Sequence, residues 1–339
     1  MRRSLLIALV LIAAATAASV AAGFMLQKPE EEKAEGLSDA FDAATDGTIG
    51  YVSYSEGKAG IHLRNPDGTL SGPLAETATD RRIADLSFSP DGRTIAYSVV
   101  PKDPTKGVSS TVRFLDTESG TDEAALEDDG MITEIRFDPD DPDRLYLLRA
   151  AVFENYSPVA APHPHDFDVH LYRLSDRSMQ ALTDLKAYEM QSLNVPAGDS
   201  VFFSMFGDEE AETAEETFEA KLGIYRVASG GGTPERVDLD VSEDVYDFLI
   251  LPDGDIIYQA VAKTSDSGIF EYELFRFDRA SGKSRQLTRL KTHAGKPIAG
   301  PGGEMIWFLE NTGFATSRPD FHLKQMPADG GPVTDIPLD

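Results

Sequence analysis

The chain has 339 residues, of which 58 are acidic and 31 are basic, so that its formal net charge at pH 7 is −27. A surface this acidic repels phosphate backbones and anionic lipid headgroups, which argues against nucleic acid as a partner. The charge either keeps an exported protein soluble or attracts cations or a basic partner. The sequence has no cysteine, which excludes disulfides, a thiol nucleophile and a lipid attached through cysteine.

The N-terminus combines a short basic start with a long apolar segment. Arg2 and Arg3 precede 22 residues without a charge, residues 5–26. This length suffices for one helix across a bilayer, although residues 15–17 also form the A-x-A site of a cleavable signal peptide. Both alternatives place the rest of the chain outside the cytoplasm. We predict a membrane anchor or signal peptide over residues 1–26, a charged tether over 27–39 and one domain over 40–339.

A turn that contains proline recurs along this domain, flanked each time by alternating apolar and polar residues. The prolines of the five clearest copies are 49, 57, 56 and 49 residues apart: Pro90, Pro139, Pro196, Pro252 and Pro301. A shorter copy without proline precedes them at residues 44–51. A period of this size is typical of the blades of a propeller.

Each copy predicts four strands. Before the turn, Leu86 and Phe88 alternate with polar residues, as expected of a half-buried strand. After the turn, an apolar residue stands two positions before a large one, as in Ile95 and Tyr97, and another tight turn joins a third and a fourth strand. Six such sheets predict an all-β fold, a six-bladed β-propeller of four-stranded antiparallel blades.

The turn SPDG at residues 89–92 and the pairs Leu182-Thr183 and Leu287-Thr288 resemble the repeat of the TolB-like propeller family, which consists of WD40-like or PD40 repeats. The resemblance covers about residues 40 to 339, and it does not include the α/β domain ahead of the propeller in TolB. The resemblance implies a β-propeller fold. Similar propellers act as binding platforms, as domains attached to peptidases and as lyases, so the role of TolB itself is not carried over.

The predicted topology distinguishes two faces of the ring. The connections between the second and third strands, and those between blades, open on one face, which we call the long-loop face. Four long insertions fall there, at residues 149–165, 206–222, 262–270 and 311–319. Because long loops on a rigid scaffold concentrate binding, we expect an envelope protein, a peptide or a glycan to bind this face.

A stretch rich in histidine and aspartate ends the first insertion, and its candidate ligands are His163, His165, Asp166, Asp168 and His170. In an extended chain, His163 and His165 point the same way with Cα atoms about 6.6 Å apart, so they could share a zinc ion. The remaining three point to the opposite side. The alternative is the polar outer face of a third strand, because the fifth blade has Glu271 and Glu273 where Asp168 and His170 fall.

Three carboxylates recur at one position of the repeat. Asp85, Glu134 and Asp247 each lie five residues before the turn proline, near the start of the innermost strand. They could coordinate a hard cation such as calcium at the mouth of the central channel. The alternative is that they hydrate a channel filled with water. No cofactor is required by the sequence, and a divalent cation, zinc or calcium, is the candidate.

The sequence lacks the usual catalytic motifs: it has no Gly-x-Ser-x-Gly elbow, no Walker loop and no His-Glu-x-x-His helix. We therefore expect a non-enzymatic binding platform outside the cytoplasm, tethered to the membrane by its N-terminal segment. The alternative is a metal-dependent propeller enzyme, lyase-like or hydrolase-like, that resembles the propeller-fold pectate-fragment lyases and uses His163 and His165.

Overall fold

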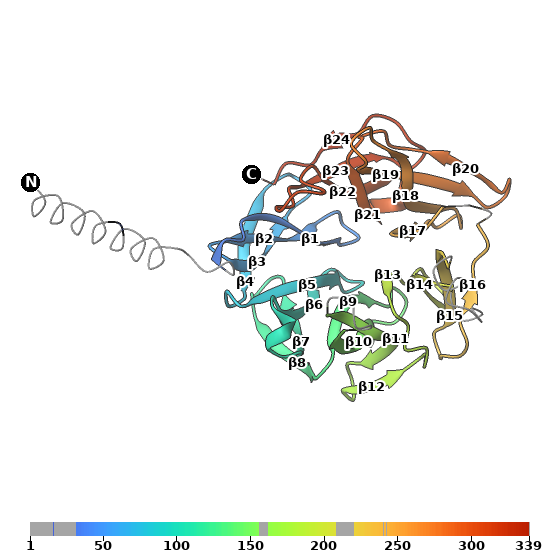
Figure 1. Cartoon of the computed structure of the whole chain (residues 1–339). Coiled ribbons are helices and arrows are strands. Elements are labelled where there is room, and N and C mark those ends of the chain that lie inside the picture. Colours follow the sequence, from blue (N-terminus) through green and yellow to red (C-terminus); the bar gives the residue numbers. More distant parts are fainter. Residues whose placement is uncertain are drawn as a thin grey trace, which may run out of the picture.

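The computed structural model describes residue 16 and residues 32–155, 162–207, 220–239, 241 and 243–338. Apart from residue 16, the predicted anchor at residues 1–26 lies outside these residues, as does the first part of the predicted tether. Within the described ranges, no helix is long and apolar enough to span a membrane. The regular secondary structure of the described chain is almost entirely β-strand, arranged in sheets around a common axis (Figure 1).

The first three blades each consist of four consecutive strands in antiparallel order. Blade 1 contains β1 (Gly36–Ala43), β2 (Ile49–Ser55), β3 (Lys58–Arg64) and β4 (Leu70–Glu76). Blade 2 contains β5 (Arg81–Phe88), β6 (Thr94–Pro101), β7 (Ser110–Asp116) and β8 (Asp122–Asp128), with the 3-10 turn η2 (Pro104–Lys106) between β6 and β7. Blade 3 contains β9 (Met131–Phe137), β10 (Arg144–Glu154), β11 (His163–Arg173) and β12 (Ser178–Ala181).

The last three blades repeat this order, and a parallel bridge between Tyr272 of the fifth blade and His293 of the sixth joins these two into one eight-stranded sheet. Blade 4 contains β13 (Met190–Asn194), β14 (Ser200–Phe206), β15 (Leu222–Ala228) and β16 (Glu235–Arg236). Blade 5 contains β17 (Phe248–Ile250), β18 (Ile256–Thr264), β19 (Phe270–Asp278) and β20 (Lys283–Gln286). Blade 6 contains β21 (His293–Ala299), the 3-10 turn η3 (Pro301–Gly303), β22 (Met305–Asn311), β23 (Phe321–Pro327) and β24 (Thr334–Asp335). These six units confirm the predicted fold class, an all-β structure of four-stranded antiparallel blades.

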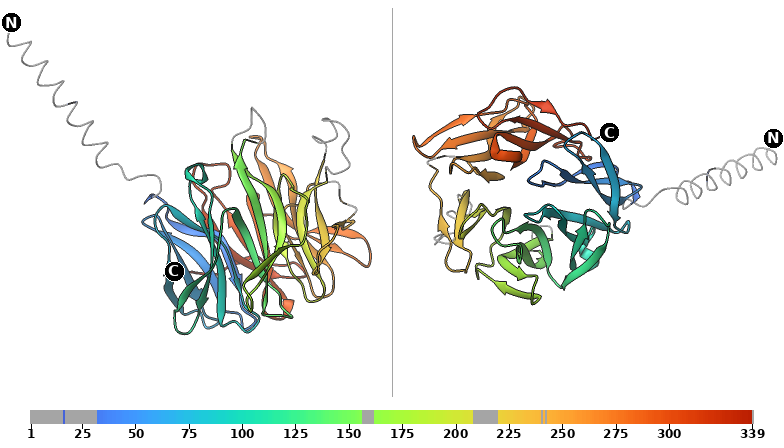
Figure 2. Two further views of the ribbon diagram at one scale, coloured as in Figure 1. Left: turned by 90° about the horizontal axis from the view of Figure 1, so that it is seen from below. Right: turned by 180° about the vertical axis from the view of Figure 1, so that it is seen from behind.

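The ring is closed by contact between its first and last blades. The first strand of each blade lies at the centre of the ring and contacts the first strand of the next blade, and β1 contacts both β21 and β23 (Figure 2, right). No strand of the described chain is shared between blades 1 and 6. The junction is instead a cluster of apolar side chains from both blades: Phe41, Ile49, Tyr51, Trp307, Leu309, Leu323 and Ile336. Closure therefore depends on side-chain packing.

The recurring turn has the geometry that its sequence predicts. Gly92 has a φ of 72°, a conformation that favours glycine, and its N–H donates to the carbonyl of Ser89 at 2.8 Å. The Ser89 hydroxyl donates to Asp91 at 2.7 Å and accepts from the N–H of Thr94 at 3.0 Å. A Cβ at Gly92 would stand 3.3 Å from the Cβ of Ala44 in the first blade. The turns thus also pack against each other around the ring.

The innermost strand of blade 2 departs from its predicted half-buried character. Leu86 and Phe88 are buried in the apolar core as expected, but Asp85 and Ser87 on the other side of β5 are also buried, at 2% and 3% exposed. The period of two is correct. The polar side chains face the next blade rather than solvent, because blades pack on both sides of the strand.

The four long insertions lie between the second and third strands of blades 3 to 6, as the topology predicts. In blade 3 much of the insertion extends the hairpin, with Val152 paired to His165 and Glu154 paired to His163. This hairpin rises above the long-loop face (Figure 2, left). It therefore brings the start of β11 to the rim at the centre of that face.

Candidate functional site

The carboxylates at the centre of the ring connect neighbouring blades. Asp85 accepts a hydrogen bond from the N–H of Ile135 in blade 3 at 3.0 Å. Glu134 accepts from the N–H groups of Ser192 and Leu193 in blade 4, at 2.8 and 2.7 Å. Because the innermost strand has an unpaired edge, its N–H groups need such acceptors. The repeat position found in the sequence is thus a contact between blades.

The same connection is made in other blades. Asp247 accepts from the N–H of Lys296 in blade 6 at 2.7 Å. Asp42 in blade 1 accepts from the N–H of Phe88 at 2.8 Å. Sequence reasoning missed Asp42 because the copy of the turn that follows it lacks the proline that marks the register. In blade 4 the hydroxyl of Ser192 serves, accepting from the N–H of Phe248 at 2.8 Å.

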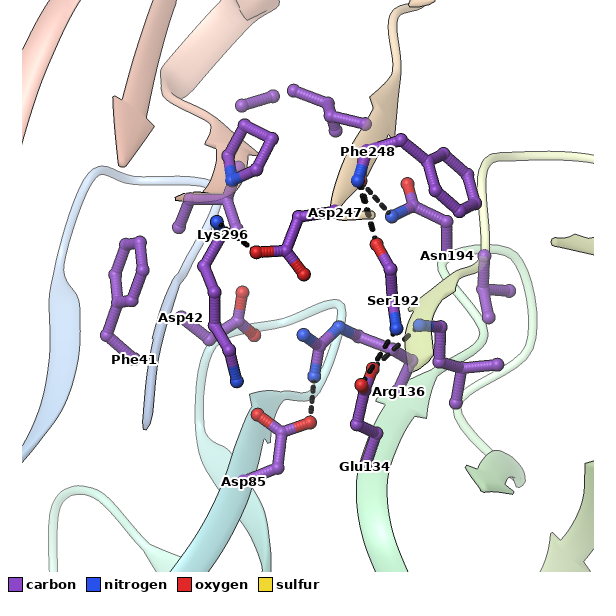
Figure 3. Close-up of a pocket in the computed structure, with 16 residues that line it drawn as sticks. Phe41, Asp42, Asp85, Glu134, Arg136, Ser192, Asn194, Asp247, Phe248 and Lys296 are labelled. Carbon is purple, nitrogen blue, oxygen red and sulfur yellow. Dashed lines mark hydrogen bonds and ion pairs between the residues drawn. The ribbon is translucent and has the colours of Figure 1, made fainter. Parts of the chain in front are cut away.

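Two cations lie among these carboxylates (Figure 3). Arg136 forms an ion pair with Asp85. Lys296 Nζ lies 3.6 Å from Asp39 Oδ2. Burial opposes the charge of both cations, but the surrounding carboxylates raise the pKa of each above its usual value. Both therefore stay charged.

Burial raises the pKa values of three of the central carboxyl groups, those of Asp42, Asp85 and Asp247. Nearby cations oppose the shift, Arg136 for Asp42 and Asp85 and Lys296 for Asp247, without cancelling it. Four carboxyl groups and two cations line the inner cavity of the ring. The centre of the ring is acidic even after its ion pairs are formed.

Two cavities lie at the centre of the ring and share Glu134 and Lys296 in their walls. The inner cavity has a volume of about 180 Å³, and its charged lining residues are Asp42, Asp85, Glu134, Arg136, Asp247 and Lys296 (Figure 3). The outer cavity has a volume of about 380 Å³. Its lining includes the starts of β11 and β13, so it lies on the side of the long-loop face.

The outer cavity brings together one residue from each of the two predicted sets. His163 and Glu134 both line it, together with Asp39, Arg82 and Lys296. Asp85 and Asp247 line only the inner cavity, and His165 lines neither. The predicted site residues that line a cavity are therefore divided between the two cavities. Of the histidine-rich stretch, only His163 among the candidate ligands lines the outer cavity.

His163 and His165 lie on the same side of β11, as their spacing predicts, with ring centroids 5.9 Å apart. His165 is 9% exposed, and its Nδ1 lies 2.8 Å from Asp166 Oδ1. The Nε2 atom of His163 is buried and has no hydrogen-bond partner in the described part of the chain. Burial, with a smaller contribution from the charge of His165, lowers the pKa of His163, so its ring is neutral at neutral pH.

Asp168 has a structural partner in the closing Leu-Thr pair. Its Oδ1 accepts from the hydroxyl of Thr183 and the N–H of Leu185, both at 2.7 Å. In blade 5, Glu273 accepts in the same way from Thr288 and from the N–H of Lys291. Asp168 therefore corresponds to Glu273, which corrects the alignment expected from the sequence by two residues.

His170 lies farther along β11, opposite Leu147 of β10. Its Nδ1 is 3.3 Å from the carbonyl oxygen of Asp168, and burial lowers the pKa of its ring. Within the described residues, no group of three or more His, Asp or Glu side chains is arranged to hold a metal ion. The zinc site at His163 and His165 and the calcium site at Asp85, Glu134 and Asp247 stay predictions.

A group of aromatic side chains on the long-loop face was not predicted. Phe270 and Tyr272 lie at the start of β19, His293 begins β21, and Tyr246 and Phe314 lie in connections between strands. The ring centroids of Tyr246 and Tyr272 are 5.2 Å apart, and those of His293 and Phe314 are 4.6 Å apart. Phe270 is 49% exposed at its edge. The members of the group occupy different positions within the repeat, so the sequence does not reveal that they lie together in the fold.

Neither a family model nor a curated protein matches the sequence. Solved structures do match. TolB from Acinetobacter baumannii aligns with a TM-score of 0.59 at 20% sequence identity, over 86% of this chain and 63% of TolB. The fold is that of a β-propeller. This chain thus spans less than two thirds of the length of that TolB.

Propellers with other activities are similarly close. An oligogalacturonate lyase in complex with manganese aligns with a TM-score of 0.57 at 13% identity, over 89% of this chain and 77% of the lyase. The propeller domain of the Trilobed protease from Pyrococcus furiosus, described as having an open velcro topology, aligns with a TM-score of 0.52 at 12% identity, over 90% of this chain and 96% of that domain. At this identity the likeness concerns the fold alone, because one fold carries many functions.

Proposed function

We propose that this protein is a non-enzymatic binding platform outside the cytoplasm, tethered by its N-terminal segment, and that a partner protein, peptide or glycan enters the outer cavity from the long-loop face. The observation that carries the proposal is the outer cavity itself. It is the meeting point of five blades, four of which contribute charged side chains from β1, β5, β9 and β21: Asp39, Arg82, Glu134 and Lys296.

The walls of this cavity are held in place before any ligand arrives. Glu134 is fixed by two N–H groups of blade 4, and Lys296 is held by Asp39 of the neighbouring blade 1. A pre-organised site loses less entropy on binding than a flexible one. The connections around the mouth differ in length and composition between blades, which supports selectivity for one partner.

The location outside the cytoplasm is supported by the sequence of the N-terminus. Arg2 and Arg3 precede an uncharged segment of 22 residues, and the positive-inside rule places the following domain on the far side of the membrane. The acidic surface suits an exported domain, because a high net charge opposes association.

One observation favours the alternative, a metal-dependent enzyme. His163 directs a neutral ring to the outer cavity, and its buried Nε2 has no described hydrogen-bond partner. Neutral imidazole is a common zinc ligand. A second ligand would have to come from His165, whose ring is 5.9 Å away between centroids.

The two functions are separated by one set of measurements on the purified full-length protein. We expect His163→Ala and Arg82→Ala to reduce the recovery of a partner from envelope extract, while Glu118→Lys and Glu304→Lys in turns of the opposite face leave it unchanged. The proposal is overturned if only the opposite-face variants lose the partner. Stoichiometric metal in the wild type that disappears in His163→Ala would favour the enzyme.

A further inference from the structure

Glu189 occupies an unusual position in the outer cavity. It ends the connection between blades 3 and 4, directly before β13, and lines the cavity beside Tyr188. Burial alone raises the pKa of its carboxyl group. Its side chain makes no hydrogen bond or ion pair with the described part of the chain. The fold thus holds a partly buried carboxyl group without a compensating charge.

The other charged groups of this cavity are already compensated. Lys296 faces four carboxylates, with Asp39 the largest contributor, and the charge of Arg82 acts on the same Asp39. Glu134 accepts two backbone hydrogen bonds. An isolated carboxylate is costly to bury, so a cavity that retains one favours a cation as its ligand.

Aromatic rings stand on the same side of the mouth. The connection that contains Tyr246 lies beside β13: Gln191, two residues after Glu189, pairs with Ser204, whose hydroxyl donates to the carbonyl of Tyr246. Burial is the main cause of the raised pKa of Tyr246, and the charge of Glu189 adds to it. Tyr246 contacts the ring of Tyr272 edge to face, at 5.2 Å between centroids. Tyr188, next to Glu189, contacts His163 at 4.5 Å between ring centroids. A carboxylate bordered by aromatic rings is an arrangement that attracts ammonium and guanidinium groups.

We propose that Glu189 and the rings of Tyr246 and Tyr272 form a subsite for a lysine or arginine side chain of a partner polypeptide. The proposal rests on the proposed function and deepens it, because it selects a basic protein or peptide over a neutral glycan. The net charge of −27 acts in the same direction, since it raises the association rate of a basic partner. A bare metal ion is a poorer fit, because the described residues around Glu189 provide no cluster of ligands.

The test uses the full-length protein and a capped tetralysine peptide, with the same peptide acetylated on every lysine as the neutral probe. We expect tetralysine to bind the wild type, and Glu189→Gln to weaken that binding on the order of tenfold, as loss of a hydrogen bond to a charged group does. The matched control is Glu304→Gln, which removes the same charge from the opposite face and should change the affinity less than twofold. Equal loss in both variants would show diffuse attraction only and overturn the subsite.

Variants of Tyr246 test the aromatic part of the subsite separately from the carboxylate of Glu189. Tyr246→Leu removes the ring and should weaken tetralysine binding several-fold, whereas Tyr246→Phe keeps the ring and should retain most of it. Thermal denaturation of each variant confirms that it is folded. If Tyr246→Leu binds as the wild type does while it is folded, the aromatic part of the subsite is wrong.

The pH dependence gives a further readout. Binding to the wild type and to Glu304→Gln should fall as the pH is lowered through the raised pKa of Glu189, and Glu189→Gln should lack this step. The other ionisable groups of the cavity and the neighbouring Tyr246 are common to all three proteins; those of the cavity are Asp39, Arg82, Glu134, His163, Tyr188 and Lys296. If His163→Ala loses the envelope partner while Glu189→Gln keeps tetralysine, the proposed function stands and the subsite fails.

Discussion

At the centre of the ring, the carboxylates of Asp85, Glu134 and Asp247 each accept a hydrogen bond from the next blade. At the mouth of the outer cavity, the carboxylate of Glu189 accepts no hydrogen bond from a described residue. The same chemical group therefore holds the scaffold together in one region and is available to a ligand in the other. The difference lies in the backbone that each side chain meets. The central carboxylates face unpaired N–H groups at the edge of the next innermost strand, and buried N–H groups need an acceptor.

The largest expected effect comes from breaking the ion pair at the centre. Asp85→Ala should lower the free energy of unfolding by about 3 kcal/mol, because it leaves Arg136 and the N–H of Ile135 without their acceptor. Chemical denaturation measures the change. The double variant Asp85→Ala/Arg136→Met should recover part of the loss, and a double variant less stable than Asp85→Ala would contradict the assignment.

Glu134→Ala should lower the free energy of unfolding by about 2 to 3 kcal/mol, since two backbone N–H groups of blade 4 lose their acceptor. Glu134→Gln keeps one carbonyl acceptor and should lose about half as much. Urea denaturation of both variants gives the comparison. Equal stability of Glu134→Ala and wild type would mean that the contact between blades contributes nothing.

Asp247→Asn tests whether burial raises the pKa of the Asp247 carboxyl group at the centre of the ring. Because the pKa of Asp247 is raised above its ordinary value of 3.8 in the folded protein, its protonation favours folding. This stabilisation is complete below pH 3.8 and is lost as the pH rises through the folded pKa. The wild type should therefore gain stability relative to Asp247→Asn as the pH falls from 7 towards 4. A difference in unfolding free energy that is independent of pH would refute the shift.

The smallest effect is expected at the mouth. Glu189→Gln should change the free energy of unfolding by no more than about 0.5 kcal/mol, because the side chain makes no bond that folding requires. Thermal denaturation of Glu189→Gln and Glu134→Ala, measured side by side, compares a glutamate of the mouth with a glutamate of the centre. A loss similar to that of Glu134→Ala would show that Glu189 belongs to the scaffold and would remove the contrast between the two regions.

The fold could be predicted because its information is local and repeated. Each proline turn marks the same point of a blade, so the spacing of Pro90, Pro139 and the later copies fixes the number of units and the direction of the connections. The same register located Asp85, Glu134 and Asp247. Their role could not be predicted, because the acceptor of each hydrogen bond lies on one blade and its donor on the next.

Residues outside the repeat register were beyond sequence reasoning. Glu189 and Tyr246 lie in two different connections between blades and Tyr272 lies in β19, so the sequence gives no sign that the fold places these segments in neighbouring blades. The alignment of Asp168 with the fifth blade failed for a related reason. The hairpin of β10 and β11 extends to the pair Glu154 and His163, so counting along the sequence does not preserve the position along β11.

The way the ring closes has a mechanical consequence. Blades 1 and 6 share no strand in the described chain, and the first described strand, β1, and the last, β24, belong to these two blades (Figure 1). A force applied through the N-terminal segment would act first on β1, which contacts β21 and β23 across that junction. The contacts that resist it include the apolar cluster of the two blades, the pair Asp39 and Lys296, and the hydrogen bond from Arg64 Nε to the carbonyl of Pro337. Because Lys296 also lines both cavities, tension on the proposed tether would act directly on the walls of the proposed binding site.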